Sequence, residues 1–291
     1  GPQKTMRIAQ QLYEGVALGD EGMVGVITYM RTDSTRIEPE AISEVRSFIE
    51  SVHGAAMLPE KPNFFASKKG AQDAHEAIRP TSAYRTPEAI RPYLTDEQLA
   101  LYTLIWQRFV ASQMAPAVLD QITVDVDARQ YGFRAVGSVV KFPGFTKLYE
   151  ESKDDAGDDE AAHPIPPVSE GELLDPQELK PEQHFTKPPA RYTEASLIRA
   201  LEEEGIGRPS TYAPTINTIQ EREYVAREKG RLKPTELGEQ VNRILVANFP
   251  DILDLRFTAH LEEDLDKVEE GECEWHALLA EFYGSFSKDL R

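Results

Sequence analysis

The spacing of apolar residues predicts helices in the first third of the chain. Apolar side chains recur every three or four positions in residues 4–14, 39–53 and 95–113, which is the period of an amphipathic helix. Thr95 is a suitable N-cap for the last of these helices. Residues 24–29 form a short β-branched run preceded by glycine, and this run predicts a buried strand.

The pattern changes after Pro116. Residues 121–127 alternate between apolar and polar at period two, and residues 132–147 contain further strand-like runs broken by glycine and proline. This region is therefore predicted to be rich in β-structure. Residues 150–168 are acidic and then proline-rich, which is typical of an exposed loop.

Helical spacing returns at Thr193, which can cap a helix running to about Glu204. Residues 205–210 supply a glycine turn before a second helix over residues 211–222, and residues 224–233 indicate a hairpin. A helix, a turn, a second helix and a hairpin together indicate a winged helix-turn-helix. The apolar residues that follow predict ordinary helical core, and they include Leu245, Phe249, Ile252, Leu255, Leu261, Leu265, Trp275, Leu278, Leu279, Phe282 and Phe286.

Two regions supply nearly all of the net charge of −18. Residues 150–182 carry 2 basic and 12 acidic side chains, and residues 234–291 carry 5 and 14. Residues 1–149 are nearly balanced, with 16 basic and 17 acidic, and residues 183–233 carry 9 and 7. An acidic total argues against a nucleic-acid partner, because phosphates are repelled. The distribution nevertheless leaves the balanced segments free to present local positive surfaces.

A chain of 291 residues predicts two or three domains. Its single cysteine, Cys273, excludes an intrachain disulfide and a cysteine-rich zinc ribbon. No apolar run is long enough to span a membrane, and no signal-peptide pattern is visible. We therefore expect a cytoplasmic protein without a membrane partner. The chain opens with Gly-Pro-Gln rather than Met, which indicates part of a longer protein.

Arg31 and Asp33 lie two and four positions after Tyr29, and this cluster has two interpretations. A tyrosine that attacks phosphorus forms a covalent phosphotyrosine and conserves the bond energy for resealing. A neighbouring guanidinium would bind the phosphate and stabilise the transition state. The alternative is a structural tyrosine at a strand end, with a local Arg–Asp pair at a turn.

Residues 25–34, Gly-Val-Ile-Thr-Tyr-Met-Arg-Thr-Asp-Ser, closely resemble the active-site signature of type IA DNA topoisomerases. Met30 favours the bacterial topoisomerase I branch, since topoisomerase III enzymes usually have proline there. Three further segments resemble family motifs: residues 74–80, 185–197 and 205–212. All four occur in the family's order and cover essentially the whole chain.

The resemblance implies roles for named residues. The implied catalytic residues are Tyr29, Arg31 and His75, and the implied supporting residues are Thr32, Asp33, Ser34 and Glu76. The implied DNA-binding residues are Arg79, Lys187, Arg191, Arg208, Ser210 and Thr211, of which the last three begin a helix whose free N–H groups suit a phosphate. The alternatives are a structural histidine at position 75, plain helix capping at 210–211, and solvated surface charge for the remaining basic residues.

The resemblance also implies a multidomain α+β fold in which helical domains and a β-rich arch form a ring. Residues 1–115 would carry the nucleophile, residues 116–185 would form part of the arch, and residues 186–291 would form a helical DNA-binding domain. The implied reaction cuts one strand of single-stranded or underwound DNA through a 5′-phosphotyrosine. Another strand then passes and the break is resealed, which relaxes negative supercoils without ATP at the nucleoid.

Magnesium ligands of the family lie in a Toprim domain with an Asp-x-Asp-x-Glu motif. Asp125 and Asp127 imitate its start, but Arg129 stands where glutamate is expected, and the alternation suits a strand face. We expect no metal or cofactor in this chain, which would be a central fragment without the Toprim domain, its partner in the whole enzyme. The fragment alone is expected not to relax supercoils.

Two other functions fit parts of the sequence. One is a non-catalytic module that binds single-stranded DNA. The other is a different strand transferase that forms a phosphotyrosine, such as a tyrosine recombinase with a 3′ linkage or a relaxase with a histidine metal cluster. The histidine pairing of a relaxase is not present in the sequence.

Overall fold

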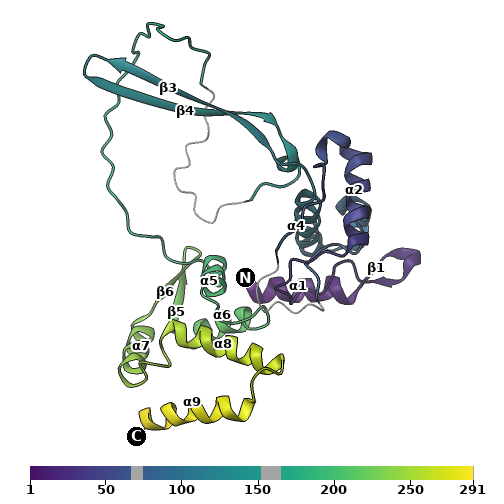
Figure 1. The fold of residues 1–291 in the computed structure, drawn as a ribbon, viewed down its shortest axis with the longest axis vertical. Helices are drawn as coiled ribbons and strands as arrows, with labels where there is room; N and C mark the ends of the chain where they lie inside the picture. The colour runs from purple at the N-terminus through teal and green to yellow at the C-terminus, as the bar shows by residue number, and fades with distance from the viewer. Residues whose placement is uncertain (67–74, 152–164, 291) are drawn as a thin grey trace.

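The computed structural model describes residues 1–66, 75–151 and 165–290. Figure 1 shows two groups of helices, with a long two-stranded hairpin projecting from the first group. An extended segment after residue 165 leads back to the second group (Figure 1). The fold mixes helix and sheet, as the sequence predicts. Most of the predicted acidic loop at 150–168 lies outside the described residues.

The first group contains the three long helices that apolar spacing predicts. They are α1 (Pro2–Glu14), α2 (Pro39–His53) and α4 (Asp96–Ser112). Thr95 caps α4 as expected, and it does so in a capping box with Gln98. The shorter elements of this group are β1 (Val16–Ala17), η1 (Gly19–Glu21), β2 (Met23–Val24), η2 (Ala55–Met57), α3 (Pro87–Ile90) and η3 (Arg91–Tyr93).

The main hydrophobic core lies in this first group. Leu12 of α1, Val45 of α2 and Tyr102 of α4 are fully buried at its centre. Trp106 of α4 packs edge-on to Phe48 of α2, with ring centroids 5.5 Å apart. Its indole N–H donates to the carbonyl of Ala83 at 2.9 Å, so the polar atom of this buried ring is satisfied.

The predicted strand at 24–29 is only partly correct. β2 ends at Val24, and further along only Ile27 forms a bridge, opposite Pro80. Proline has no amide hydrogen, so a regular ladder cannot continue through Pro80. Main-chain bonds on either side of Pro80 hold the segment instead, from Thr28 N to Arg79 O and from Thr81 N to Val26 O, each 2.9 Å long.

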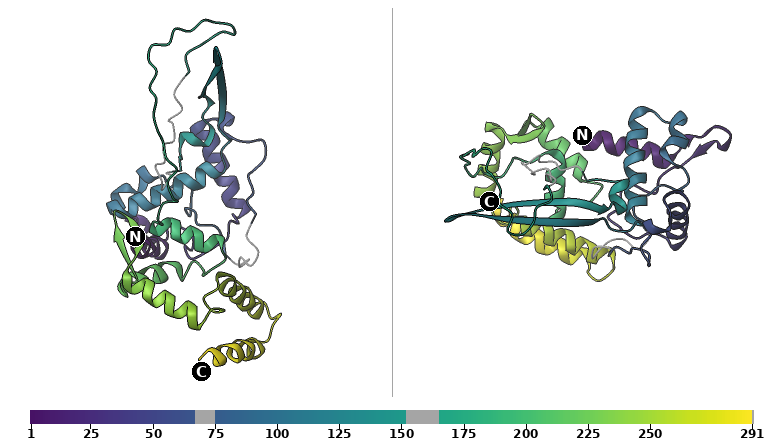
Figure 2. Two further views of the ribbon diagram at one scale, coloured as in Figure 1. Left: turned by 90° about the vertical axis from the view of Figure 1, so that its left-hand side faces the viewer. Right: turned by 90° about the horizontal axis from the view of Figure 1, so that it is seen from above.

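The predicted β-rich region is one antiparallel hairpin, β3 (Val118–Ala128) and β4 (Tyr131–Phe142), followed by η4 (Gly144–Lys147). The hairpin projects away from the helices in two perpendicular views (Figures 1 and 2). Its register places Val126 opposite Phe133 and Asp125 opposite Arg134. The face with Val126 and Phe133 is mainly apolar, and the face with Asp125 and Arg134 also carries Val136 and Val140, which are at least half exposed.

The second group begins with α5 (Glu194–Glu203) and α6 (Tyr212–Glu221), followed by the hairpin β5 (Val225–Glu228) and β6 (Arg231–Pro234). All four elements agree with the sequence prediction, and Thr193 caps α5 in a capping box with Ser196. α6 packs against α1, which brings the two groups into contact.

The last three helices are α7 (Glu236–Asn248), α8 (Leu255–Glu269) and α9 (Trp275–Asp289). The prediction that their apolar residues form ordinary core is wrong for these helices. Leu255, Leu265, Trp275 and Leu279 are each at least half exposed. Helical spacing predicts an apolar face, but it does not predict what covers that face. In the described part of the chain, no helix is long and apolar enough to cross a membrane.

Candidate active site

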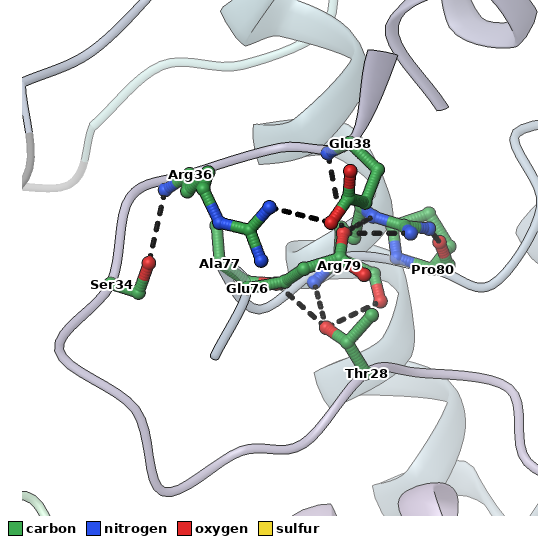
Figure 3. A network of polar contacts seen from close by, with 8 residues as sticks. All are labelled: Thr28, Ser34, Arg36, Glu38, Glu76, Ala77, Arg79 and Pro80. Atoms are coloured by element: carbon green, nitrogen blue, oxygen red, sulfur yellow. Dashed lines mark hydrogen bonds and ion pairs between the residues drawn. The ribbon is translucent and has the colours of Figure 1, made fainter. Parts of the chain in front are cut away.

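The segment around Tyr29 is joined to residues 76–80 by the polar network in Figure 3. The Thr28 hydroxyl donates to the carbonyl of Ala77 at 2.7 Å and accepts from the amide of Arg79 at 2.9 Å. Eight residues later on the same segment, the carbonyl of Arg36 accepts from the amide of Ala77 at 2.7 Å. Two segments about fifty positions apart in the sequence are thereby fixed side by side.

Tyr29 lies half-buried between two aromatic rings. Its ring meets Tyr13 edge-on at a centroid distance of 5.4 Å, and it meets His75 at 5.2 Å with the rings tilted by 42°. Within the described ranges, no hydrogen bond engages the Tyr29 hydroxyl. The ring is therefore positioned by packing, and its oxygen is available for another partner.

Gly25 explains how the Tyr29 segment approaches α1 so closely. A Cβ at position 25 would lie 2.6 Å from the carbonyl oxygen of Tyr13, which is shorter than any normal contact. The amide of Val26 donates to the carbonyl of Leu12 at 2.9 Å. Only a residue without a side chain allows the chain to pass the end of α1 at this distance.

The residues after Tyr29 form a tight polar turn. The amide of Ser34 donates to the Thr32 hydroxyl at 3.0 Å, and the amide of Arg36 donates to the Ser34 hydroxyl at 3.2 Å. Ser34 is buried, so its role in this structure is to shape the turn. Arg31 is exposed, and among the described residues no hydrogen bond or ion pair engages its guanidinium.

Glu76 and Arg79 form an ion pair beneath this turn. Arg79 donates to Oε2 of Glu76 through Nε at 2.9 Å and through Nη2 at 2.8 Å. Its Nη1 donates to the carbonyl of Pro80 at 3.0 Å, and only 12% of its side chain is exposed. All three nitrogens of this guanidinium are engaged internally, so Arg79 in this conformation serves the scaffold.

The loop before α6 holds the second set of predicted residues. The Thr211 hydroxyl accepts from the amide of Arg208 at 2.9 Å and donates to its carbonyl at 3.1 Å. Thr211 therefore closes the loop rather than capping α6 through its side chain. Ser210 is exposed. Arg208 reaches α8, where its Nη2 lies 2.6 Å from Asp266 Oδ2 and its Nη1 lies 3.6 Å from Glu262 Oε2.

A cleft of about 830 Å³ separates the two groups of helices. Met30, Thr32 and Asp33 line it from the first group, and Arg208 and Tyr212 line it from the second. The structure thus brings Tyr29 against His75, and it places the residues after Tyr29 across a cleft from Arg208. Lys187 and Arg191 are exposed on the segment before α5 and do not line this cleft.

The cleft is more acidic than the sequence motifs suggest. Burial, followed by the charge of Glu202, raises the pKa of the Tyr212 hydroxyl. The Asp33 carboxylate acts in the same direction from the other side of the cleft. Sequence reasoning did not single out Tyr212, Glu262 or Asp266. The local signals were the position of Tyr212 at the end of the 205–212 segment and the spacing of Glu262 and Asp266, which places both on one face of a helix.

No set of three or more metal-ligating side chains is arranged to hold an ion among the described residues. Asp125 and Asp127 do not fit a magnesium site. Both carboxylate oxygens of Asp125 accept from Arg134 on the neighbouring strand, at 2.7 and 3.0 Å. This pairing lowers the pKa of Asp125 and confirms that the Asp-x-Asp pattern belongs to a strand face.

A family model described as DNA topoisomerase matches residues 1–280. Proteins described as DNA topoisomerase 1 from two strains of Xylella fastidiosa are each 50% identical over 290 residues, which cover 98% of this chain and 36% of theirs. The chain therefore spans about a third of the length of these relatives. A solved structure of full-length topoisomerase I from Thermotoga maritima matches with a TM-score of 0.84 and 39% identity, over 99% of this chain and 46% of that one.

Proposed function

This chain belongs to the bacterial type IA DNA topoisomerases, and we propose that it supplies the nucleophile, Tyr29, for transient cleavage of one DNA strand. The observation that carries the proposal is the setting of Tyr29. Its ring is packed between Tyr13 and His75 while its hydroxyl is not engaged by any described residue, and the next residue, Met30, lines the cleft between the two groups of helices. A fixed ring with an available oxygen suits a nucleophile.

In the proposed reaction the phenol oxygen of Tyr29 attacks a backbone phosphorus. A Tyr29 O–P bond forms, giving a 5′-phosphotyrosine, and the bond from phosphorus to the 3′ oxygen of the preceding nucleotide breaks. The proton lost by the phenol is balanced by the proton gained by the new 3′ hydroxyl. Another strand passes, and the reverse attack by that hydroxyl reseals the break. One phosphoester replaces another, so relaxing negative supercoils needs no ATP.

Arg31 and His75 would hold and polarise the phosphate. The exposed guanidinium of Arg31 has no partner among the described residues, and His75 packs against the nucleophile ring. Arg208, Ser210 and Thr211 would grip the strand across the cleft, with weaker contributions from Arg79, Lys187 and Arg191. Thr32, Asp33, Ser34 and Glu76 would shape the site.

We assign residues 1–115 to the nucleophile-bearing domain, residues 116–185 to part of a β-rich arch, and residues 186–291 to a DNA-binding domain with a winged helix-turn-helix. The projecting hairpin and the α5–α6–β5–β6 order support these assignments. We place the magnesium site in a Toprim domain of the whole enzyme, outside these 291 residues, where the ion would neutralise charge at the phosphate. DNA at the bacterial nucleoid, in the cytoplasm, would be the substrate.

The test joins this chain to the rest of its enzyme and traps the covalent complex. The whole enzyme should relax negatively supercoiled DNA and yield an adduct at the 5′ end of the cut strand, and Tyr29→Phe should abolish both while keeping the ring. Full relaxation by Tyr29→Phe would refute the nucleophile assignment. Strand binding without any adduct would favour a non-catalytic DNA-binding module, and a 3′ adduct would favour another class of strand transferase. The 291-residue chain alone should bind single strands and leave supercoils unchanged.

A further inference from the structure

The guanidinium of Arg208 is already paired with carboxylates of α8. Its Nη2 contacts Asp266 at 2.6 Å, its Nη1 lies 3.6 Å from Glu262, and the same Nη1 donates to the carbonyl of Gly207 at 2.9 Å. The two carboxylates are four residues apart and therefore project from one face of the helix. About a third of the Arg208 side chain remains exposed to the cleft.

A guanidinium binds phosphate most strongly through two parallel N–H bonds. In Arg208 both terminal nitrogens already have acceptors within the protein: Nη1 donates to the Gly207 carbonyl and lies near Glu262, and one N–H of Nη2 is taken by Asp266. A phosphate that takes the place of either carboxylate must compete with it directly. A phosphate that binds the remaining N–H groups, on Nε and Nη2, meets a guanidinium whose charge the two carboxylates already balance.

The charges around Arg208 favour its pairing with Asp266 and Glu262. Asp33 faces Arg208 from the first group, while Glu263 and Asp266 face it from α8, and the rim of α5 adds Glu202, Glu203 and Glu204. No other basic side chain lines the cleft among the described residues. Without its carboxylate partners, Arg208 would be a positive side chain in a cleft whose other charged side chains, among the described residues, are acidic.

α8 can also be displaced at little cost. It has no buried residue, and it lies against the loop where Ala259 approaches Gly205. Moving a helix that buries little apolar surface costs little free energy, because that cost rises with the area exposed.

We propose that Glu262 and Asp266 form a carboxylate clasp that holds Arg208 until a DNA phosphate replaces them. This inference rests on the proposed role of Arg208 in gripping the strand and adds a regulatory step to that role. The two carboxylates act as internal competitors of the phosphate. They weaken binding of a single strand and withhold Arg208 from weaker anions.

The test measures binding of a fluorescein-labelled oligothymidylate to the 291-residue chain by fluorescence anisotropy. Asp266→Asn should raise the affinity about threefold to tenfold, and Glu262→Gln about twofold to threefold because its contact is longer. Glu263→Gln is the matched control. It removes the same charge from the same helix and the same cleft, but it does not touch Arg208. It should change the affinity less than about twofold.

Arg208→Ala separates the clasp from the proposed function. It should weaken binding about tenfold, and in that background Asp266→Asn should gain no more than Glu263→Gln. If Arg208→Ala weakens binding but Asp266→Asn matches Glu263→Gln or lowers the affinity, the clasp is refuted while the strand contact stands. If Arg208→Ala leaves binding unchanged, the strand contact fails and the clasp fails with it. Circular dichroism melting of each variant checks that α8 remains folded.

Discussion

The Thr28 hydroxyl lies 2.7 Å from the carbonyl oxygen of Ala77 and donates a hydrogen bond to it. The same hydroxyl accepts from the amide of Arg79, so one side chain joins the segment before Tyr29 to the segment after His75. His75 precedes Ala77 by two residues, and Tyr29 follows Thr28 directly. The distance between the Tyr29 and His75 rings therefore depends on the side chain of Thr28.

Replacing Thr28 with valine tests this dependence, because valine keeps the shape and removes the hydroxyl. The partly buried carbonyl of Ala77 and amide of Arg79 lose their partner, which should lower the free energy of unfolding by about 1–3 kcal/mol. Covalent-adduct formation by the whole enzyme should slow, and Thr28→Ser should restore it. Thr35→Val is the control, since its hydroxyl makes one exposed contact of 3.3 Å. Equal effects of the two valine variants would contradict the dependence.

Gly25→Ala should destabilise the first group of helices. The added Cβ would meet the Tyr13 carbonyl at 2.6 Å, and the backbone next to the Tyr29 segment would have to shift. We expect a loss of about 1–3 kcal/mol. Urea unfolding followed by Trp106 fluorescence, in a Trp275→Phe background, reports on this group alone. Gly132→Ala provides the comparison, because its Cβ would meet nothing within 4 Å. Unchanged stability of Gly25→Ala would show that the approach of α1 is not tight.

His53 should make the first group sensitive to mild acid. Burial, followed by the charge of Lys147, lowers the pKa of His53, and its buried Nε2 has no hydrogen-bond partner among the described residues. The unfolded chain takes up this proton near its ordinary pKa of about 6.5, whereas the folded chain resists it. Stability is thus full above that value and falls as the pH drops below it. His53→Gln should reduce the loss between about pH 7 and pH 5, measured by urea unfolding, while the exposed His260→Gln should leave the slope unchanged.

Glu76→Gln should lower the free energy of unfolding more than Glu38→Gln, which breaks a more exposed ion pair. Arg79 is 12% exposed and would lose its only carboxylate partner among the described residues, for a cost of about 1–3 kcal/mol. Glu38→Gln removes a similar charge from Arg36 in a pair that is about two-fifths exposed, and it should cost less than about 1 kcal/mol. Thermal melts of both variants provide the comparison. Indistinguishable melts would mean that the buried position of Arg79 does not depend on Glu76.

The sequence predicts local structure here better than it predicts contacts. α2 and α4 follow from apolar spacing and from Pro39 and Thr95 at their starts, because these signals act within one helical turn. The pairing of Tyr29 with His75 came from family resemblance, since no local pattern spans the residues between them. The link from Arg208 to Asp266 was missed because it joins two helices whose relative position depends on packing. The exposure of α8 and α9 was missed for the same reason.

The bonds of Thr28 also determine what can move. The proposed nucleophile, Tyr29, is held in the first group of helices by main-chain bonds on both sides of Pro80, so it is not carried on a flexible arm. An opening that carries Tyr29 away from Arg208 would therefore part α1 from α6, because these two helices are in contact. If the whole enzyme passes a strand as proposed, the distance between spin labels on α1 and α6 should increase during that step, while the distance between labels beside Thr28 and Arg79 should stay the same. Tyr29 would thus move together with the first group of helices, while the chain through β3 and β4 keeps that group connected to the second.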